Sequence, residues 1–138
     1  MKNITLWYCY FLTISFIILS CEQNSHPNYE RNLASTQNFF NYINENDGLE
    51  KMTSMLSEEI KHQSPTYDGK IRNYNERIEE LSGYFNGFIN LKYEANSWLP
   101  NTDKNGNLTG GVRTYGNWTG EFVETGKENS INSLHYYN

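Results

Sequence analysis

Apolar residues recur at helical spacing through the first part of the chain and alternate with polar residues in the last part. The most regular helical pattern spans residues 71–88, where apolar side chains follow one another at intervals of three and four. They are Ile71, Tyr74, Ile78, Leu81 and Phe85. This spacing predicts one amphipathic helix over residues 71–88. The charged residues of its other face are expected to be solvated: Arg72, Glu76, Arg77, Glu79 and Glu80.

Two further helices are predicted before that segment, over residues 30–46 and 49–57. Their apolar positions fall on one face of each helix: Leu33, Phe40 and Ile43 in the first, and Leu49, Met52 and Leu56 in the second. The sequence Asn-Asp-Gly at 46–48 is a good helix stop. A short strand is expected over residues 58–62, and a loop with two turn formers follows at 64–69.

Three strands are predicted in the last part of the chain, over residues 91–99, 112–123 and 130–137, because apolar and polar residues alternate there. Asn105-Gly106 lies between the first two and is a strong hairpin signal. Helices followed by an antiparallel meander indicate an α+β fold, in which the helices cover one face of a curved sheet.

The alternation also assigns side chains to faces of the predicted sheet. In the first strand Tyr93 and Trp98 fall on opposite faces, because their positions differ by an odd number. In the last strand His135 and Tyr137 share a face. Trp118, His135 and Tyr137 are the candidates of the late strands for the interior.

The N-terminus has the order of a secretory signal peptide. A short tip with Lys2 precedes an apolar run over residues 4–19, which is too short and wrongly flanked for a stable membrane span. The end of the run, Ile-Leu-Ser-Cys at 18–21, resembles the bacterial lipobox, in which lipid is attached to the cysteine. We therefore expect a signal peptide over residues 1–20, lipidation of Cys21, and a lipoprotein anchored to a membrane of the bacterial cell envelope.

Composition narrows the classes of partner. The formal net charge of the 138 residues is -5, which argues against nucleic acid and against a polybasic contact with anionic lipid. Cys9 leaves with the signal peptide and Cys21 carries lipid, so no thiol remains for a disulfide. No spacing of Cys and His indicates a metal site.

Several segments resemble the SnoaL-like proteins of the nuclear transport factor 2-like superfamily. Tyr-Phe-Asn-Gly-Phe-Ile-Asn-Leu-Lys-Tyr-Glu at 84–94 resembles the crossing from helix to strand, and residues 112–122 with Thr-Gly-Lys at 125–127 resemble the next two strands and their turn. His-Gln-Ser-Pro at 62–65 resembles the short strand and loop after the second helix. The resemblance implies a cone-shaped α+β barrel that encloses an apolar cavity and needs no cofactor.

The chain departs from this family in two respects. The late strands carry no obvious inward Asp, and the further strand that usually follows has no counterpart before Asn138. We divide the chain into a signal peptide at 1–20, a lipidated cysteine and polar tether at 21–30 and a SnoaL-like domain at 31–138. Two explanations for the final strand stay open: the sequence is a fragment, or the sheet is trimmed. An uncovered strand edge would invite pairing with another chain. His26 is expected to be a solvated residue of the tether.

Candidate site residues follow from chemistry and predicted position. His62 and His135 are candidates for proton transfer, because imidazole titrates near neutral pH. Arg113 is a candidate clamp for an anionic group, or a partner of a nearby carboxylate. Asp68 and Glu94 would serve as a general base only if buried. Aromatic side chains are the candidate pocket walls and rim: Tyr84, Trp98, Trp118 and Tyr137.

Three functions remain open from the sequence. The first is a lipid-anchored domain that binds a small apolar or aromatic molecule. The second is an isomerase, cyclase or hydrolase that works by acid/base chemistry without a cofactor, through His62 or His135. The third is an interaction module that forms a homodimer through the outer face of its sheet.

Overall fold

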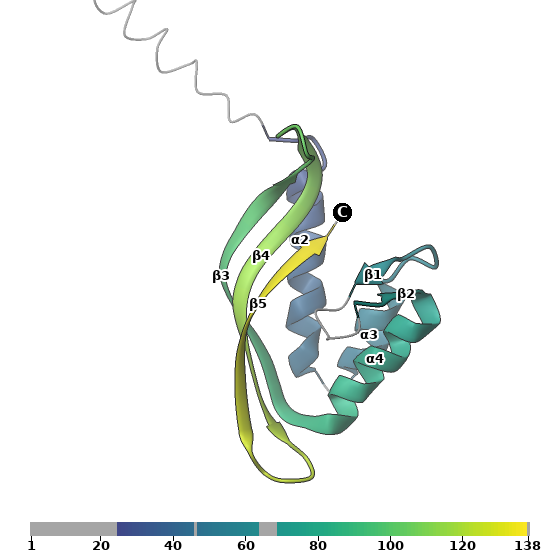
Figure 1. The fold of residues 1–138 in the computed structure, drawn as a ribbon, viewed down its shortest axis with the longest axis vertical. Helices are drawn as coiled ribbons and strands as arrows, with labels where there is room; N and C mark the ends of the chain where they lie inside the picture. Colours follow the sequence, from purple (N-terminus) through teal and green to yellow (C-terminus); the bar gives the residue numbers. More distant parts are fainter. Residues whose placement is uncertain (1–24, 46, 64–68, 138) are drawn as a thin grey trace, which may run out of the picture.

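The computed structural model describes residues 25–45, 47–63 and 69–137. The predicted order is confirmed, with helices first and an antiparallel sheet last (Figure 1). The helices are α2 (Tyr29–Asn41), the short 3-10 helix η1 (Tyr42–Asn44), α3 (Gly48–Ser54) and α4 (Tyr74–Gly87). The strands are β1 (His62–Gln63), β2 (Ile71–Arg72), β3 (Phe88–Thr102), β4 (Leu108–Phe122) and β5 (Glu128–Tyr137). The predicted signal peptide and Cys21 lie outside the described residues.

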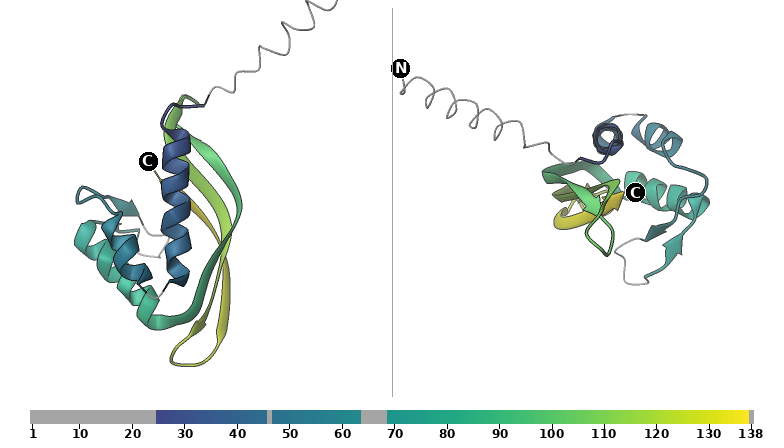
Figure 2. Two further views of the ribbon diagram at one scale, coloured as in Figure 1. Left: turned by 180° about the vertical axis from the view of Figure 1, so that it is seen from behind. Right: turned by 90° about the horizontal axis from the view of Figure 1, so that it is seen from above.

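The main sheet has the strand order β3-β4-β5, and both pairs are antiparallel. It is strongly bent, and α2 runs along its concave side while α3 and α4 lie beyond (Figures 1 and 2). Strands β1 and β2 form a separate antiparallel hairpin. Within the described residues no strand lies on the free edge of β5, so this edge carries unpaired backbone groups.

The core forms where the helices meet the sheet. The buried apolar side chains of its main cluster come from α2, η1, α3 and α4: Phe39, Phe40, Ile43, Met52 and Leu81. Half-buried aromatic side chains of the sheet pack against them, including Tyr93, Trp98, Trp118 and Tyr137. Burial of this amphipathic set supplies most of the helical stability, as it does in short helices generally.

Helix α4 begins later than the periodicity predicts. Ile71 lies in β2 and is 61% exposed, so it is no part of the helical face. Asn73 ends the extended segment because its side chain accepts a hydrogen bond from the backbone of Glu76, whose carboxylate bonds back to the Asn73 N–H. This capping box starts the helix at Tyr74. The predicted helix over residues 71–88 is therefore wrong at both ends, since Phe88 already belongs to β3.

The first two predicted helices and the short strand also differ in extent. The helix predicted over residues 30–46 changes to a tighter turn at Tyr42, and α3 ends at Ser54. The strand predicted over residues 58–62 is wrong except for His62, where β1 begins. The expected loop at 64–69 lies outside the described residues except for Gly69.

A β-bulge in β3 reverses the predicted faces. Ala95 pairs with Gly116 and Ser97 with Tyr115, so Asn96 is an extra residue on this strand. An extra residue turns every later side chain to the opposite face. Trp98 consequently joins Tyr93 on the core side, which corrects the prediction that they lie on opposite faces.

One residue before α2, His26, packs against the sheet, although its neighbours Ser25, Pro27 and Asn28 are exposed. His26 is half-buried, and its imidazole lies against Gly110, where an added Cβ would come within 2.4 Å of Nδ1. Asn32 donates a hydrogen bond of 2.9 Å to the Gly110 carbonyl. The expectation that His26 is a solvated tether residue is therefore wrong.

Candidate functional site

A cavity of about 600 Å³ lies between the helices and the concave face of the sheet. The helices contribute a mainly apolar wall: Phe39, Phe40, Ile43, Met52, Leu81 and Phe85. Strands β4 and β5 contribute the opposite wall, which includes Trp118, Ile131, Ser133, His135 and Tyr137. The volume is within the range of small-molecule sites, which are mostly apolar with few polar groups.

Phe40 stands at the centre of the aromatic wall. Its ring stacks on Tyr93 at a centroid distance of 4.1 Å and lies 5.7 Å from Trp118. His135 and Tyr137 approach the same ring edge-on, at 5.4 and 5.7 Å. Edge-to-face and offset contacts of this kind hold rings in fixed orientations. The wall is therefore a rigid surface on which a flat apolar molecule can pack.

His135 is a neutral polar group within this wall. Trp118 donates a hydrogen bond from Nε1 to Nε2 of His135 at 3.0 Å, and the Ser133 hydroxyl lies 3.0 Å from the same nitrogen. An indole N–H can only donate, so Nε2 accepts and the neutral ring carries its proton on Nδ1. Burial, followed by the charge of Arg77 and the electrostatic effect of His62 when that imidazole is protonated, lowers the pKa of His135 to about 4.

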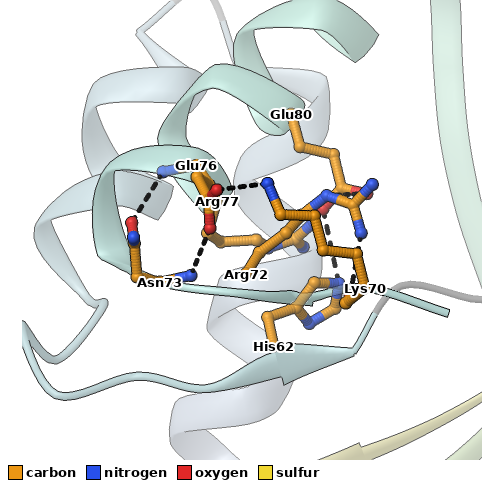
Figure 3. Close-up of polar contacts among 7 residues, drawn as sticks. All are labelled: His62, Lys70, Arg72, Asn73, Glu76, Arg77 and Glu80. Atoms are coloured by element: carbon orange, nitrogen blue, oxygen red, sulfur yellow. Dashed lines mark hydrogen bonds and ion pairs between the residues drawn. The ribbon is translucent and has the colours of Figure 1, made fainter. Parts of the chain in front are cut away.

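His62 belongs to a charged cluster at the start of α4 (Figure 3). Arg77 donates from Nη1 to Oε2 of Glu80 at 2.6 Å, and Nε2 of His62 lies 3.4 Å from the same oxygen. Nε of Arg72 lies 3.6 Å from the other carboxylate oxygen. Burial and the charges of Arg77 and Arg72 outweigh the nearby Glu80 and lower the pKa of His62 to about 4.

The cavity brings together most of the residues predicted for a site. Its lining includes His62 from β1, Tyr84 from α4, Trp118 from β4, and His135 and Tyr137 from β5. Tyr137 is half-buried, and the desolvation of its phenol raises the pKa, so the phenol stays protonated. Residues from four elements thus converge, although they are far apart in the chain.

Two predicted site residues lie elsewhere. Trp98 packs against Phe40, with ring centroids 5.7 Å apart, and is not among the residues that line the cavity. Arg113 lies between Val112 and Thr114, which are both fully buried, so strand alternation points Arg113 to the outer face. There its guanidinium lies 5.9 Å from the ring centroid of Tyr115. The expectation that Arg113 clamps a ligand in the pocket is therefore wrong.

Glu94 does not serve as a buried base. It is exposed and pairs with Lys92, whose hydrogen bond lowers the pKa of the Glu94 carboxyl. Asp68, the other candidate, lies outside the described residues. Among the residues that the structure does describe, no cluster of His, Cys, Asp and Glu has the arrangement of a metal site.

Arg77 and Glu80 are the residues that sequence reasoning missed. The helical pattern predicts a solvated face for both, yet Arg77 is 9% exposed overall and the Glu80 side chain is 11% exposed. A signal for Arg77 is present, because it stands three residues after Tyr74 and four before Leu81. At helical spacing this places the arginine on the apolar face.

Comparison with known proteins supports the fold. The structure is similar to the crystal structure of an NTF2-like protein of unknown function from Exiguobacterium sp. 255-15, with a TM-score of 0.60 and 12% sequence identity. The match covers 74% of this chain and 83% of that chain. No protein-family model and no curated protein matches the sequence. The fold is thus nuclear transport factor 2-like, as the resemblance implied, and fold alone does not assign a function.

Proposed function

We propose that this domain binds a small, largely apolar or aromatic molecule in the cavity. The observation that supports the proposal is the cavity of about 600 Å³. Aromatic and aliphatic side chains line it, together with a few polar groups. Phe40 and Trp118 offer stacking surfaces, and His62, His135 and Tyr137 offer hydrogen bonds. This combination is the usual composition of a ligand pocket in proteins.

Binding is better supported than proton transfer. A general base works best when its pKa lies near the operating pH. Both histidines have pKa values lowered to about 4, so at neutral pH each imidazole is a weak base. The lone pair of His135 Nε2 is also engaged by Trp118. An acid/base enzyme on this fold would need a base with a better-matched pKa.

Native mass spectrometry of the purified full chain tests the proposal. We expect a co-purified molecule of a few hundred daltons or, failing that, one-to-one binding of an uncharged aromatic probe such as biphenylmethanol. The variant Trp118→Ala should reduce occupancy, whereas Tyr136→Ala on the outer face should leave it unchanged. A chain that binds no apolar molecule at all would contradict the proposal.

We further infer that the domain is exported and held on a membrane through lipid on Cys21. The apolar run followed by Ser20 and Cys21 supports this. No described helix is both long and apolar enough to cross a bilayer, and the anchor proposed here needs none. The variant Cys21→Ser should leave the membrane fraction. Its retention there with an intact mature N-terminus would contradict the anchor.

A second candidate function is association through the outer face of the sheet. Four large side chains are 37 to 56% exposed there, and we call them the outer patch: Leu99, Tyr115, Leu134 and Tyr136. Strand register makes the patch continuous, since Tyr115 pairs with Leu134 and Arg113 pairs with both Leu99 and Tyr136. Contiguous apolar surface of this kind favours a protein contact.

A further inference from the structure

Arg77 is the one residue with a permanent charge among the described residues that line the cavity, and no carboxylate stands beside it in that lining. The arginine comes from α4, and its side chain is 10% exposed. A charge held in so apolar a site is costly unless it is paired or meets an opposite charge. The cavity therefore carries a fixed positive charge that any ligand must accommodate.

Glu80 pairs with Arg77 and also approaches other groups. Its carboxylate bonds Nη1 of Arg77 at 2.6 Å, but it also lies 3.6 Å from Nε of Arg72. The same carboxylate stands 3.4 Å from His62. One carboxylate thus approaches two guanidinium groups, and Glu80 is not among the residues that line the cavity.

The positive charge of Arg77 affects the pKa values of titratable groups on other walls of the cavity. Arg77 lowers the pKa of His62 on β1 and of His135 on β5, and its effect at His62 is larger than the opposing effect of Glu80. It also acts to lower the pKa of Tyr137, against the larger effect of burial. Groups on two other elements therefore experience net positive potential, which favours a bound anion in a medium of low dielectric constant.

The remaining polar groups can donate hydrogen bonds without adding charge. His135 is neutral and carries its proton on Nδ1, because Trp118 occupies Nε2. Tyr137 keeps its phenolic proton, since burial raises its pKa. An anionic group in the cavity would thus meet one guanidinium and neutral donors.

We propose that the ligand is an amphipathic monoanion, with an apolar or aromatic body against Phe40 and Trp118 and a carboxylate paired with Arg77. The proposal rests on the cavity being a ligand site, as proposed above. A guanidinium matches a carboxylate in shape and donates two parallel hydrogen bonds to it. One positive charge balances one negative charge, so a doubly charged phosphate would leave excess charge among apolar walls.

Calorimetric titration of the purified full chain with two matched probes tests this inference. Biphenylcarboxylic acid and biphenylmethanol share an aromatic body and differ in charge at neutral pH. We expect the acid to bind about tenfold or more tightly than the alcohol, because charge-assisted hydrogen bonds are the stronger ones. The variant Arg77→Gln should lose this preference while it retains the alcohol. Arg77→Lys should keep part of it, and Arg113→Gln, on the outer face, should keep all of it.

The outcomes separate the two proposals. Equal affinity of the wild-type chain for the acid and the alcohol would overturn the anion but leave the pocket in place. Failure of both probes to bind would count against the pocket itself and the anion with it. If Arg77→Gln does not fold, as judged by circular dichroism, the wild-type preference and its partial retention in Arg77→Lys decide the question.

Discussion

Phe40 holds the aromatic wall together, because it contacts Tyr93, Trp118, His135 and Tyr137 at once. It is 4% exposed, so its removal leaves a void that rigid neighbours cannot fill. We expect Phe40→Ala to lower the free energy of unfolding by about 3 to 5 kcal/mol, measured by chemical denaturation. Val123→Ala, a truncation at a side chain that is 53% exposed and outside the outer patch, should cost far less. Equal losses would contradict the described core.

The two cavity histidines predict a fall in stability with acid. Their ordinary pKa is 6.5, and the fold lowers it to about 4. The unfolded chain therefore binds more protons between these values, so stability is complete above pH 6.5 and declines as pH falls toward 4. Melting temperatures measured across this interval should fall steadily.

The carboxylates titrate in a lower pH range than the histidines, so their effects on stability can be separated. Glu76 and Glu94 have lowered pKa values, but their unfolded forms protonate only near 4.5, below most of the histidine interval. The double variant His62→Gln with His135→Gln should consequently melt at a temperature that varies little between pH 6.5 and 4.5. A wild-type chain that is equally stable across that interval would contradict the buried, neutral state of the histidines.

At the scale of single residues, sequence reasoning identified the aromatic and imidazole groups of the cavity better than its charges. His62, Trp118, His135 and Tyr137 were found because their types and strand positions suit a pocket. Arg77 was missed because an arginine in a charged helix is ordinarily solvated. The prediction that Arg113 reaches the pocket fails because its neighbours Val112 and Thr114 alternate inward. The strand period therefore points Arg113 outward, although its residue type suits an anion clamp.

At the scale of elements, the pairing of β4 with β3 requires a glycine at position 116. A Cβ added at Gly116 would come within 2.5 Å of the Glu94 carbonyl oxygen and of the Tyr93 ring. We expect Gly116→Ala to destabilise the chain by about 1 to 3 kcal/mol, because the backbone of β3 or the Tyr93 ring must move. Gly83 in α4 is the matched control, since an added Cβ there meets nothing within 4 Å. Gly83→Ala should stabilise by roughly 0.5 to 1 kcal/mol, measured by thermal unfolding.

The element boundaries show where periodicity misleads. Ile71 extends the helical pattern of α4 by coincidence, and the capping box of Asn73 and Glu76 decides the true start. In β3 the bulge at Asn96 breaks the period of two between Tyr93 and Trp98, and two further register shifts lie nearer the ends of the strand. Neither the capping box nor the bulge changes the number of apolar residues, so the apolar pattern of the sequence does not reveal them.

At the scale of the whole molecule, the outer patch predicts association of two chains. Its exposed aromatic and aliphatic side chains surround Arg113 on an otherwise polar face. We expect sedimentation velocity to show a dimer for the wild-type chain and a monomer for Leu134→Lys. Glu124→Lys, at an exposed turn after β4, is the control for added charge and should remain a dimer. A monomeric wild-type chain at micromolar concentration would contradict this function of the patch.

The overall architecture could be predicted because helix and strand periods occupy separate parts of the chain, which restricts the fold to helices laid on an antiparallel sheet. The resemblance supplied the curvature and the cavity. The charge inside the cavity could not be predicted, because it depends on how α4 is rotated against β1 and β5. That rotation is set by packing of Leu81 and its neighbours, which a one-dimensional pattern does not contain.

The account depends on an accessible hollow beneath the bent sheet, and a crystal structure of the chain with biphenylcarboxylic acid tests it most directly. We expect electron density for one biphenyl group beside Phe40 and Trp118, with its carboxylate within hydrogen-bond distance of Arg77. Density in which the chain's own side chains fill that space, or a probe bound only on the outer patch, would contradict the account.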